Sequence, residues 1–142
     1  MFLNFQEKPV EKNQTILLVE DDVINRVALC RFLSKQGYAV HPAKDGDEAL
    51  ENYNKKVFDL IIMDLVMPGI DGAETAKRMR FIFNSTSSDY PPIIIITAVD
   101  HRAQNLEKIF RAGVDRVVQK PIDHAQLLKC IDELLSQSKH HQ

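Results

Sequence analysis

The sequence predicts an α/β fold built on a parallel sheet, and three observations support this prediction. Short apolar runs alternate with longer segments in which apolar residues recur at helical spacing. The apolar runs are continuous rather than alternating, which is typical of parallel strands covered on both faces. Polar residues, Gly or Pro stand at the junctions and mark turns. We therefore expect one α/β domain with five strands and five helices in alternation.

The strands are expected to be short, and each ends at a polar residue or a turn. The first run ends abruptly at three consecutive acids, and the third ends at Asp64 before a Met-Pro-Gly turn. The fourth is a run of four Ile residues that ends at Thr97, and the fifth is interrupted by Lys120 and Pro121. The expected strands are residues 15–19, 38–40, 58–63, 93–96 and 114–118.

A helix is expected after each strand, with one apolar stripe facing the sheet. The first helix closes at Gly37 and the fourth at Gly113, and the last begins at Asp123. The side chains expected to face the core are Val23, Val27, Leu29, Cys30, Leu33, Ala49, Leu50, Tyr53, Ala73, Ala76, Met79, Phe83, Leu106, Ile109, Phe110, Leu127, Leu128, Ile131, Leu134 and Leu135.

Length and composition are those of a single globular domain. The chain has 142 residues, 44% of them apolar, and a formal net charge of -2. We expect an N-terminal tail or linker at 1–13, the folded domain at 14–137 and a C-terminal tail at 138–142. The sequence has no basic blocks, no membrane-length apolar run and no secretory signal. We therefore expect a cytoplasmic location and no direct contact with nucleic acid or membrane. The two cysteines are expected to be buried and reduced.

Reactive side chains gather where the expected strands end. Glu20 and Asp21 follow the first strand, Asp64 the third, Thr97 the fourth and Lys120 the fifth. In open α/β sheets, ligands bind beyond the carboxyl ends of strands, where the strand order reverses. With the order 2-1-3-4-5, this crevice lies between the first and third strands. Each residue alone has an ordinary structural explanation as a helix cap, a turn residue or a surface charge, but the combination predicts a site.

The electrostatics of that set predict a metal. Three carboxylates that converge in a cleft repel one another, and a bound cation removes the repulsion. Oxygen ligands without Cys or His favour a hard cation, so Mg²⁺ is the expected cofactor. Lys120 and Thr97 then offer a positive charge and a hydroxyl to a phosphoryl oxygen, and Asp64 is left as the nucleophile. Positioning and charge neutralisation are what phosphoryl transfer requires.

Four motifs together resemble the receiver domain of response regulators. They are ILLVEDD at 16–22, IIMDLVMPGIDG at 61–72, IITA at 95–98 and VQKPI at 118–122. The resemblance covers residues 14–137 and implies a flavodoxin-like (βα)5 doubly wound parallel sheet with strand order 2-1-3-4-5. It implies a phosphoacceptor switch in a two-component phosphorelay, rather than a turnover enzyme. The implied partner is a histidine kinase or histidine phosphotransfer protein, and a weak homodimer is left open.

The resemblance also implies roles for single positions. Asp64 resembles the phosphorylated aspartate, and Asp21 resembles the acid that binds Mg²⁺ directly, with Glu20 beside it. The backbone carbonyl of Val66 stands at a further metal-ligand position of the family. Thr97 resembles the hydroxyl residue that turns toward the phosphoryl group.

Lys120 resembles the lysine that pairs with the phosphoryl group, and its bond to Pro121 is expected to be cis.

Two positions depart from the commonest pattern of the family. Glu20 stands where many members have Asp, a variant that resembles receivers fused to sensor kinases. Val117 stands where many have Tyr or Phe, so we expect output through the loop after Thr97 and the next helix. Alternatives are a docking receiver that works without phosphorylation and, less favoured, an aspartyl-nucleophile phosphatase, which would have an acid at position 66.

Overall fold

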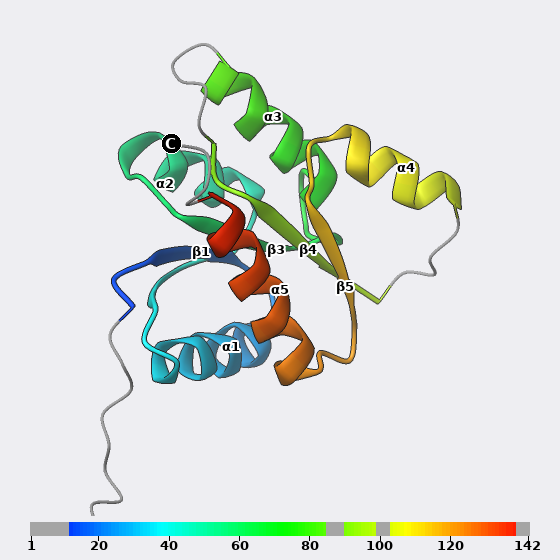
Figure 1. Cartoon of the computed structure of the whole chain (residues 1–142). Coiled ribbons are helices and arrows are strands. Elements are labelled where there is room, and N and C mark those ends of the chain that lie inside the picture. Colours follow the sequence, from blue (N-terminus) through cyan, green and yellow to red (C-terminus); the bar gives the residue numbers. More distant parts are fainter. Residues whose placement is uncertain (1–11, 85–89, 99–102, 139–142) are drawn as a thin grey trace, which may run out of the picture.

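The computed structural model describes residues 12–84, 90–98 and 103–138, which form one parallel sheet and five helices (Figure 1). The sheet has the strand order β2-β1-β3-β4-β5, so the expected fold class and strand order are confirmed. The elements in chain order are β1 (Thr15–Val19), α1 (Val23–Lys35), β2 (Ala39–Ala43), α2 (Gly46–Lys55), β3 (Leu60–Asp64), α3 (Gly72–Asn84), β4 (Ile93–Thr97), α4 (Ala103–Arg111), β5 (Arg116–Gln119) and α5 (His124–Ser138).

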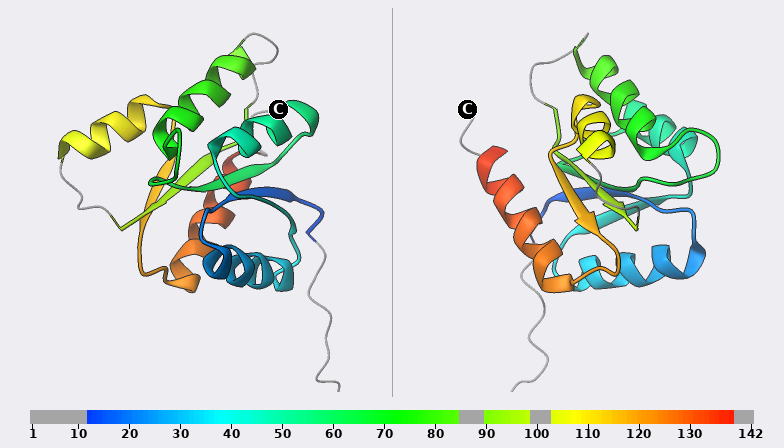
Figure 2. Two further views of the ribbon diagram at one scale, coloured as in Figure 1. Left: turned by 180° about the vertical axis from the view of Figure 1, so that it is seen from behind. Right: turned by 90° about the vertical axis from the view of Figure 1, so that its right-hand side faces the viewer.

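The sheet is the middle of three layers. Helices α1 and α5 cover one face, and α2, α3 and α4 cover the other (Figure 2). Successive side chains of a strand point to opposite faces, so β3 supplies both cores: Ile61 and Met63 pack with α2, α3 and α4, while Leu60 and Ile62 pack with α1 and α5. Every residue of β3 and β4 is buried, which explains why these strands are continuous apolar runs.

The strand register brings the polar strand ends to one edge of the sheet. Val19 is paired with Met63, so Glu20 follows β1 beside the end of β3. Asp64 is paired with Ile96, and Thr97 with Gln119. The residues that follow these pairs therefore lie close together at the carboxyl edge, although the sequence separates them by up to 100 positions (Glu20 to Lys120).

Four of the five expected strands have different bounds in the structure, and β4 differs only in that it includes Thr97. Strand β2 continues through Pro42 to Ala43; it is an edge strand, so the missing N–H of Pro42 costs no ladder hydrogen bond on its outer side. Strand β5 begins at Arg116 rather than at Val114. The third strand begins at Leu60 and ends at Asp64. Just before it, the N–H of Asp59 donates to the Thr15 carbonyl, and the Asp59 carboxylate accepts the Thr15 N–H.

Three of the side chains expected in the core are exposed. Val23 and Val27 on α1 are 60% and 43% exposed, and Phe110 on α4 is 47% exposed. The expectation was wrong because helical spacing gives a broad apolar stripe, whereas the sheet covers only part of it; Leu29 and Leu33 do pack on the sheet. The cysteines are free but only half-buried. The Phe83 side chain and segment 85–89 lie outside the described residues, as do most of the two expected tails.

A buried arginine, which the sequence pattern did not single out, joins α3 to the start of β5. The guanidinium of Arg80 donates to the carbonyls of Gly113 (2.7 Å) and Pro91 (2.6 Å) and to the carboxylate of Asp115 (3.0 Å). Asp115 also accepts from the N–H of Ile93. Gly113 has φ +94°, and a Cβ there would lie 2.6 Å from the Arg80 side chain, so this contact requires glycine. Burial lowers the pKa of Arg80, partly offset by Asp115.

We predict that Asp45→Ala lowers the free energy of unfolding by about 1 kcal/mol, the usual cost of losing an N-cap. The carboxylate of Asp45 accepts a hydrogen bond from the Glu48 N–H (2.9 Å) at the start of α2. Urea denaturation measures the change. Glu51→Ala is the matched control, since it removes only an exposed pair with Lys55 and should change stability by less than about 0.5 kcal/mol. Equal effects of the two substitutions would contradict the role of the cap.

Candidate functional site

Three carboxylates meet at the carboxyl edge of the sheet. Oxygens of Glu20, Asp21 and Asp64 all lie within 4.8 Å of one another. Asp64 is the last residue of β3 and is 7% exposed; Glu20 follows β1 and is 5% exposed, while Asp21 is open to solvent. Two acids buried this deeply require a compensating positive charge.

Part of that positive charge comes from Lys120, which follows β5. Its Nζ lies 2.9 Å from Oδ2 of Asp64 and 3.9 Å from Oε2 of Glu20. Burial by itself lowers the pKa of Lys120, but the hydrogen bond to Asp64 and the charges of the three acids outweigh it, so the pKa is raised. The ammonium group is therefore held charged against Asp64. The bond between Lys120 and Pro121 is cis, as expected.

Glu20 lies where burial and a neighbouring acid disfavour its charged form. Burial, together with the hydrogen bond and the negative charge of Asp64, raises the pKa of Glu20 to about 7, although Lys120 and Asn25 act in the opposite direction. Oε1 of Glu20 lies 3.4 Å from the side-chain amide of Asn25. A carboxyl with this pKa holds its proton at neutral pH far more readily than an ordinary glutamate, because burial, and after it the neighbouring Asp64, disfavours its charged form.

The turn that carries the acids is fixed by the first residues of α1. Asp22 is the N-cap of α1 and accepts a hydrogen bond from the Asn25 N–H (2.9 Å). Arg26 donates to the carbonyl oxygens of Glu20 (2.7 Å) and Asp21 (3.2 Å). The sequence analysis did not assign roles to Asn25 and Arg26. Their positions in the first turn of the helix, directly after the acids, are the signal that could have found them.

The remaining expected residues lie around the same edge. Thr97 is the last residue of β4 and is 2% exposed, and its carbonyl accepts the N–H of Lys120 (2.8 Å). The side chain of Val66, two residues after Asp64, is 63% exposed, and the role of its carbonyl stays a prediction. Gly72 lets α3 begin against β3, since a Cβ there would lie 2.4 Å from the carbonyl oxygen of Asp64.

The donor set suits a small hard cation. The three acids offer only oxygen atoms, two of the acids are buried, and the third opens to solvent, so water could complete the coordination. Glu20, Asp21 and Asp64 are the residues that would hold Mg²⁺. A cation there would favour the charged form of Glu20, which burial and the neighbouring Asp64 disfavour.

Comparisons with known proteins give the family of this chain. A family model described as "Response regulator receiver domain" matches residues 16–132. The chain belongs to this family. It is therefore a receiver domain of two-component signalling.

Within the described residues, no helix combines the length and the apolar character needed to cross a membrane.

Receiver domains of several organisms are similar to this one. The transcriptional regulatory protein ResD of Bacillus subtilis is 33% identical over 126 residues, covering 88% of this chain and 50% of ResD. The response regulator MprA of Mycobacterium leprae is 38% identical over 124 residues, covering 87% of this chain and 52% of MprA. The chain thus spans about half the length of these regulators. Hybrid signal transduction histidine kinase B of Dictyostelium discoideum is 32% identical over 125 residues. That match covers 83% of this chain and 6% of the kinase.

Two solved receiver structures have the same fold. The chemotaxis protein CheY4 of Vibrio cholerae superimposes with a TM-score of 0.77 at 29% identity, over 85% of this chain and 98% of CheY4. The receiver domain of Ssk1, crystallised with the histidine phosphotransfer protein Ypd1 of Saccharomyces cerevisiae, gives a TM-score of 0.76 at 30% identity. That match covers 85% of this chain and 88% of the other.

We predict that Mg²⁺ raises the melting temperature of this receiver. A ligand that binds only the folded state stabilises it by about 2.7 kcal/mol at a concentration 100 times its Kd. Differential scanning fluorimetry with and without MgCl₂ measures the shift, and a chelator should reverse it. The shift should be lost in Asp21→Asn and kept in Asp47→Asn, which changes an exposed acid on α2. An equal shift in both variants would place the ion elsewhere.

Proposed function

We propose that this receiver accepts a phosphoryl group on Asp64 from a phosphohistidine, in a reaction that depends on Mg²⁺. The observation that carries the proposal is the 2.9 Å contact between Lys120 and Asp64 inside a cluster of three carboxylates. A carboxylate held at a strand end, beside both a fixed ammonium group and a cation site, is suited to in-line attack on phosphorus.

In the proposed reaction, a carboxylate oxygen of Asp64 attacks the phosphorus atom of the donor. The P–N bond breaks, and the imidazole of the donor leaves and takes up a proton. Bound Mg²⁺ supplies positive charge for the phosphoryl oxygens. Lys120 exchanges its contact with Asp64 for the new phosphoryl group, and the hydroxyl of Thr97 acts as a hydrogen-bond donor to it. Water later hydrolyses the acyl phosphate, so the domain is a switch and not a turnover enzyme.

The exposed part of α1 supports docking of the phosphohistidine donor beside the acids. Val23, Ile24 and Val27 are 60%, 79% and 43% exposed and flank Asn25, which lies 3.4 Å from Glu20. A pocket of about 290 Å³ adjoins this surface, and its lining includes Ala28 and residues that follow β5 as well as Asp64. Ypd1, a histidine phosphotransfer protein, binds the Ssk1 receiver, so a donor of that class fits. A cytoplasmic location stays a prediction.

Phosphorylation is proposed to shift an equilibrium of the face formed by α4, β5 and α5. Val117 on β5 is half-buried and packs on the core that includes Ile109 of α4. Without an aromatic side chain at this position, the change would pass through the loop after Thr97 and α4. The loop residues 99–102 lie outside the described part of the chain. The departure at Val117 also keeps the alternative of a docking receiver that works without phosphorylation.

Incubation with acetyl phosphate, with and without Mg²⁺, tests the proposal by intact mass spectrometry. We expect the mass of one phosphoryl group to be gained only with Mg²⁺. If no adduct forms and the phosphoryl mimic beryllofluoride does not bind, the docking receiver becomes the better account. Continuous release of phosphate from simple phosphate monoesters would instead favour the phosphatase alternative.

A further inference from the structure

A groove between α3 and α4 lies on the face of the sheet opposite α1 and α5, and we name it the α3–α4 groove. It encloses about 590 Å³. Its lining includes Ala73 at the start of α3 and Ala112 just after α4, both buried and too small to fill the space between the helices. The two helices lie side by side in Figure 1 and in the left view of Figure 2. Lys77 lines the groove from α3, and Lys108 and Arg111 line it from α4.

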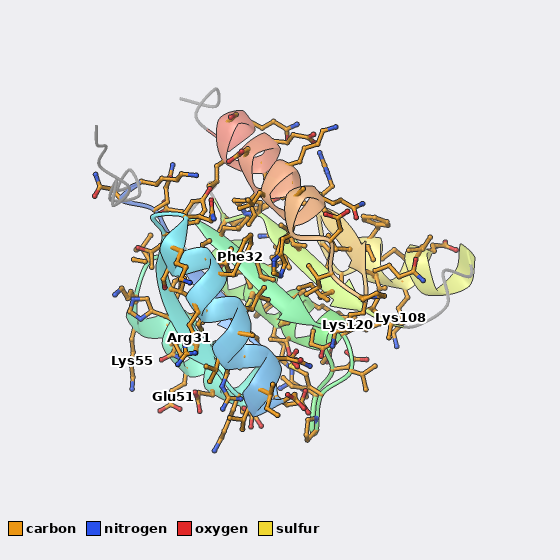
Figure 3. The ribbon with its side chains drawn as sticks, turned by 90° about the horizontal axis from the view of Figure 1, so that it is seen from below. Arg31, Phe32, Glu51, Lys55, Lys108 and Lys120 are labelled. Carbon is orange, nitrogen blue, oxygen red and sulfur yellow. The ribbon has the colours of Figure 1, made fainter. Side chains whose placement is uncertain are left out.

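The acids of this groove already have partners, whereas two of its lysines do not. Glu74 pairs with Arg78, and Glu107 pairs with Arg111, each within its own helix. Asp71 caps α3 by accepting a hydrogen bond from the Glu74 N–H (2.8 Å). Lys77 and Lys108 have no acid at ion-pair distance among the described residues, and both are exposed. Lys108 extends from α4 in Figure 3.

Apolar surface continues the groove at both ends. At one end a wider pocket of about 970 Å³ is lined by Lys77, Arg111 and Phe81, and Phe81 is 78% exposed. At the other end a pocket of about 280 Å³ is lined mainly by apolar residues, among them Leu65 and Val66, with Lys108 and Asp71 as its charged members. Lys77 and Lys108 therefore lie between two largely apolar pockets. Such a surface complements a segment that carries carboxylates along one edge and apolar side chains beside them.

We propose that the α3–α4 groove binds an acidic amphipathic helix of a partner protein. Carboxylates of the helix would pair with Lys77 and Lys108, and an apolar side chain would cover Phe81. Helix α3 has 13 residues and is about 20 Å long, which matches three to four turns of a docked helix. A nucleotide or another small polyanion fits less well, since it carries no apolar side chain that would cover Phe81.

A synthetic helical peptide of Glu and Leu residues, labelled with fluorescein, tests the proposal by fluorescence anisotropy with the unphosphorylated full chain. We expect saturable binding that K77E/K108E weakens at least tenfold. The matched control is K35E/K129E, which makes the same change in net charge at exposed lysines of α1 and α5 and should bind as the wild type does. The milder K77M/K108M variant should also weaken binding, and circular dichroism checks that all variants are folded.

Several results would overturn the proposal. These are no binding of the acidic peptide, equal loss in K77E/K108E and K35E/K129E, and equal binding of a peptide in which Lys replaces Glu. Effective competition by ATP would favour a polyanion site instead. Self-association of the wild type in sedimentation that K77E/K108E abolishes would make a second copy of this chain the occupant. The assay uses no phosphoryl donor, so its outcome is independent of the phosphorylation of Asp64.

Discussion

Replacement of Asp64 by Asn is expected to abolish phosphorylation by acetyl phosphate completely. The amide has lost the negative oxygen that is proposed to attack phosphorus, and the substitution also removes one of the three acids that could hold a metal ion. The fold should persist, since Asn has the same shape and can still contact Lys120. Intact mass spectrometry in the presence of Mg²⁺ measures the effect as the fraction of chain that carries one added phosphoryl group.

The control for this substitution is Asp47→Asn, which changes an exposed acid in the first turn of α2. It should be phosphorylated like the wild type. Urea denaturation of both variants separates a loss of chemistry from a loss of folding. A phosphorylated Asp64→Asn chain would show that another residue accepts the phosphoryl group, and Glu20 and Asp21 would then be the first candidates.

Among the substitutions considered, Arg80→Met is expected to lower the free energy of unfolding most, by about 2–4 kcal/mol. Arg80 is 9% exposed, and its removal leaves the carbonyls of Pro91 and Gly113 without their donor. The carboxylate of Asp115 loses one donor and keeps the Ile93 N–H. The cost comes mainly from the two carbonyls, since the Asp115 side chain is 38% exposed and can be partly hydrated. Urea denaturation followed by circular dichroism measures the change.

Arg78→Met provides the matched control, because Arg78 lies on the same helix but forms only an exposed pair with Glu74. Its effect should stay within about 0.5 kcal/mol. Arg80 on α3 donates to Gly113 and Asp115, which lie just before β5, so hydrogen exchange should speed up in β5 more than in β1. Equal stabilities of the two variants would mean that Arg80 contributes no more than a surface residue.

The parts of the fold that could be predicted are those governed by burial. Strands β3 and β4 are covered on both faces, and their continuous runs of Ile, Leu and Met reflect this directly. The site followed from the same pattern, since polar residues at the ends of parallel strands meet at one edge. Glu20, Asp21, Asp64 and Lys120 do meet there.

The parts that could not be predicted depend on contacts between distant segments. Nothing local to α3 distinguishes the buried Arg80 from the exposed Arg78, because only the partners from Pro91 and the α4–β5 turn make the difference. Likewise, Val27 and Leu29 are both apolar helix residues, and only packing against the sheet separates the exposed one from the buried one. Helical periodicity gives the direction of a face but not its width.

The measurement that tests the central claim most directly is the location of the phosphoryl group. The wild-type chain is phosphorylated with acetyl phosphate and Mg²⁺, reduced with borohydride to convert the acyl phosphate into homoserine, digested and sequenced by tandem mass spectrometry. We predict homoserine at position 64, in the peptide that contains Leu65 and Val66. Homoserine at another acid, or none at all after an adduct has formed, would contradict the assignment of Asp64 as the phosphoacceptor.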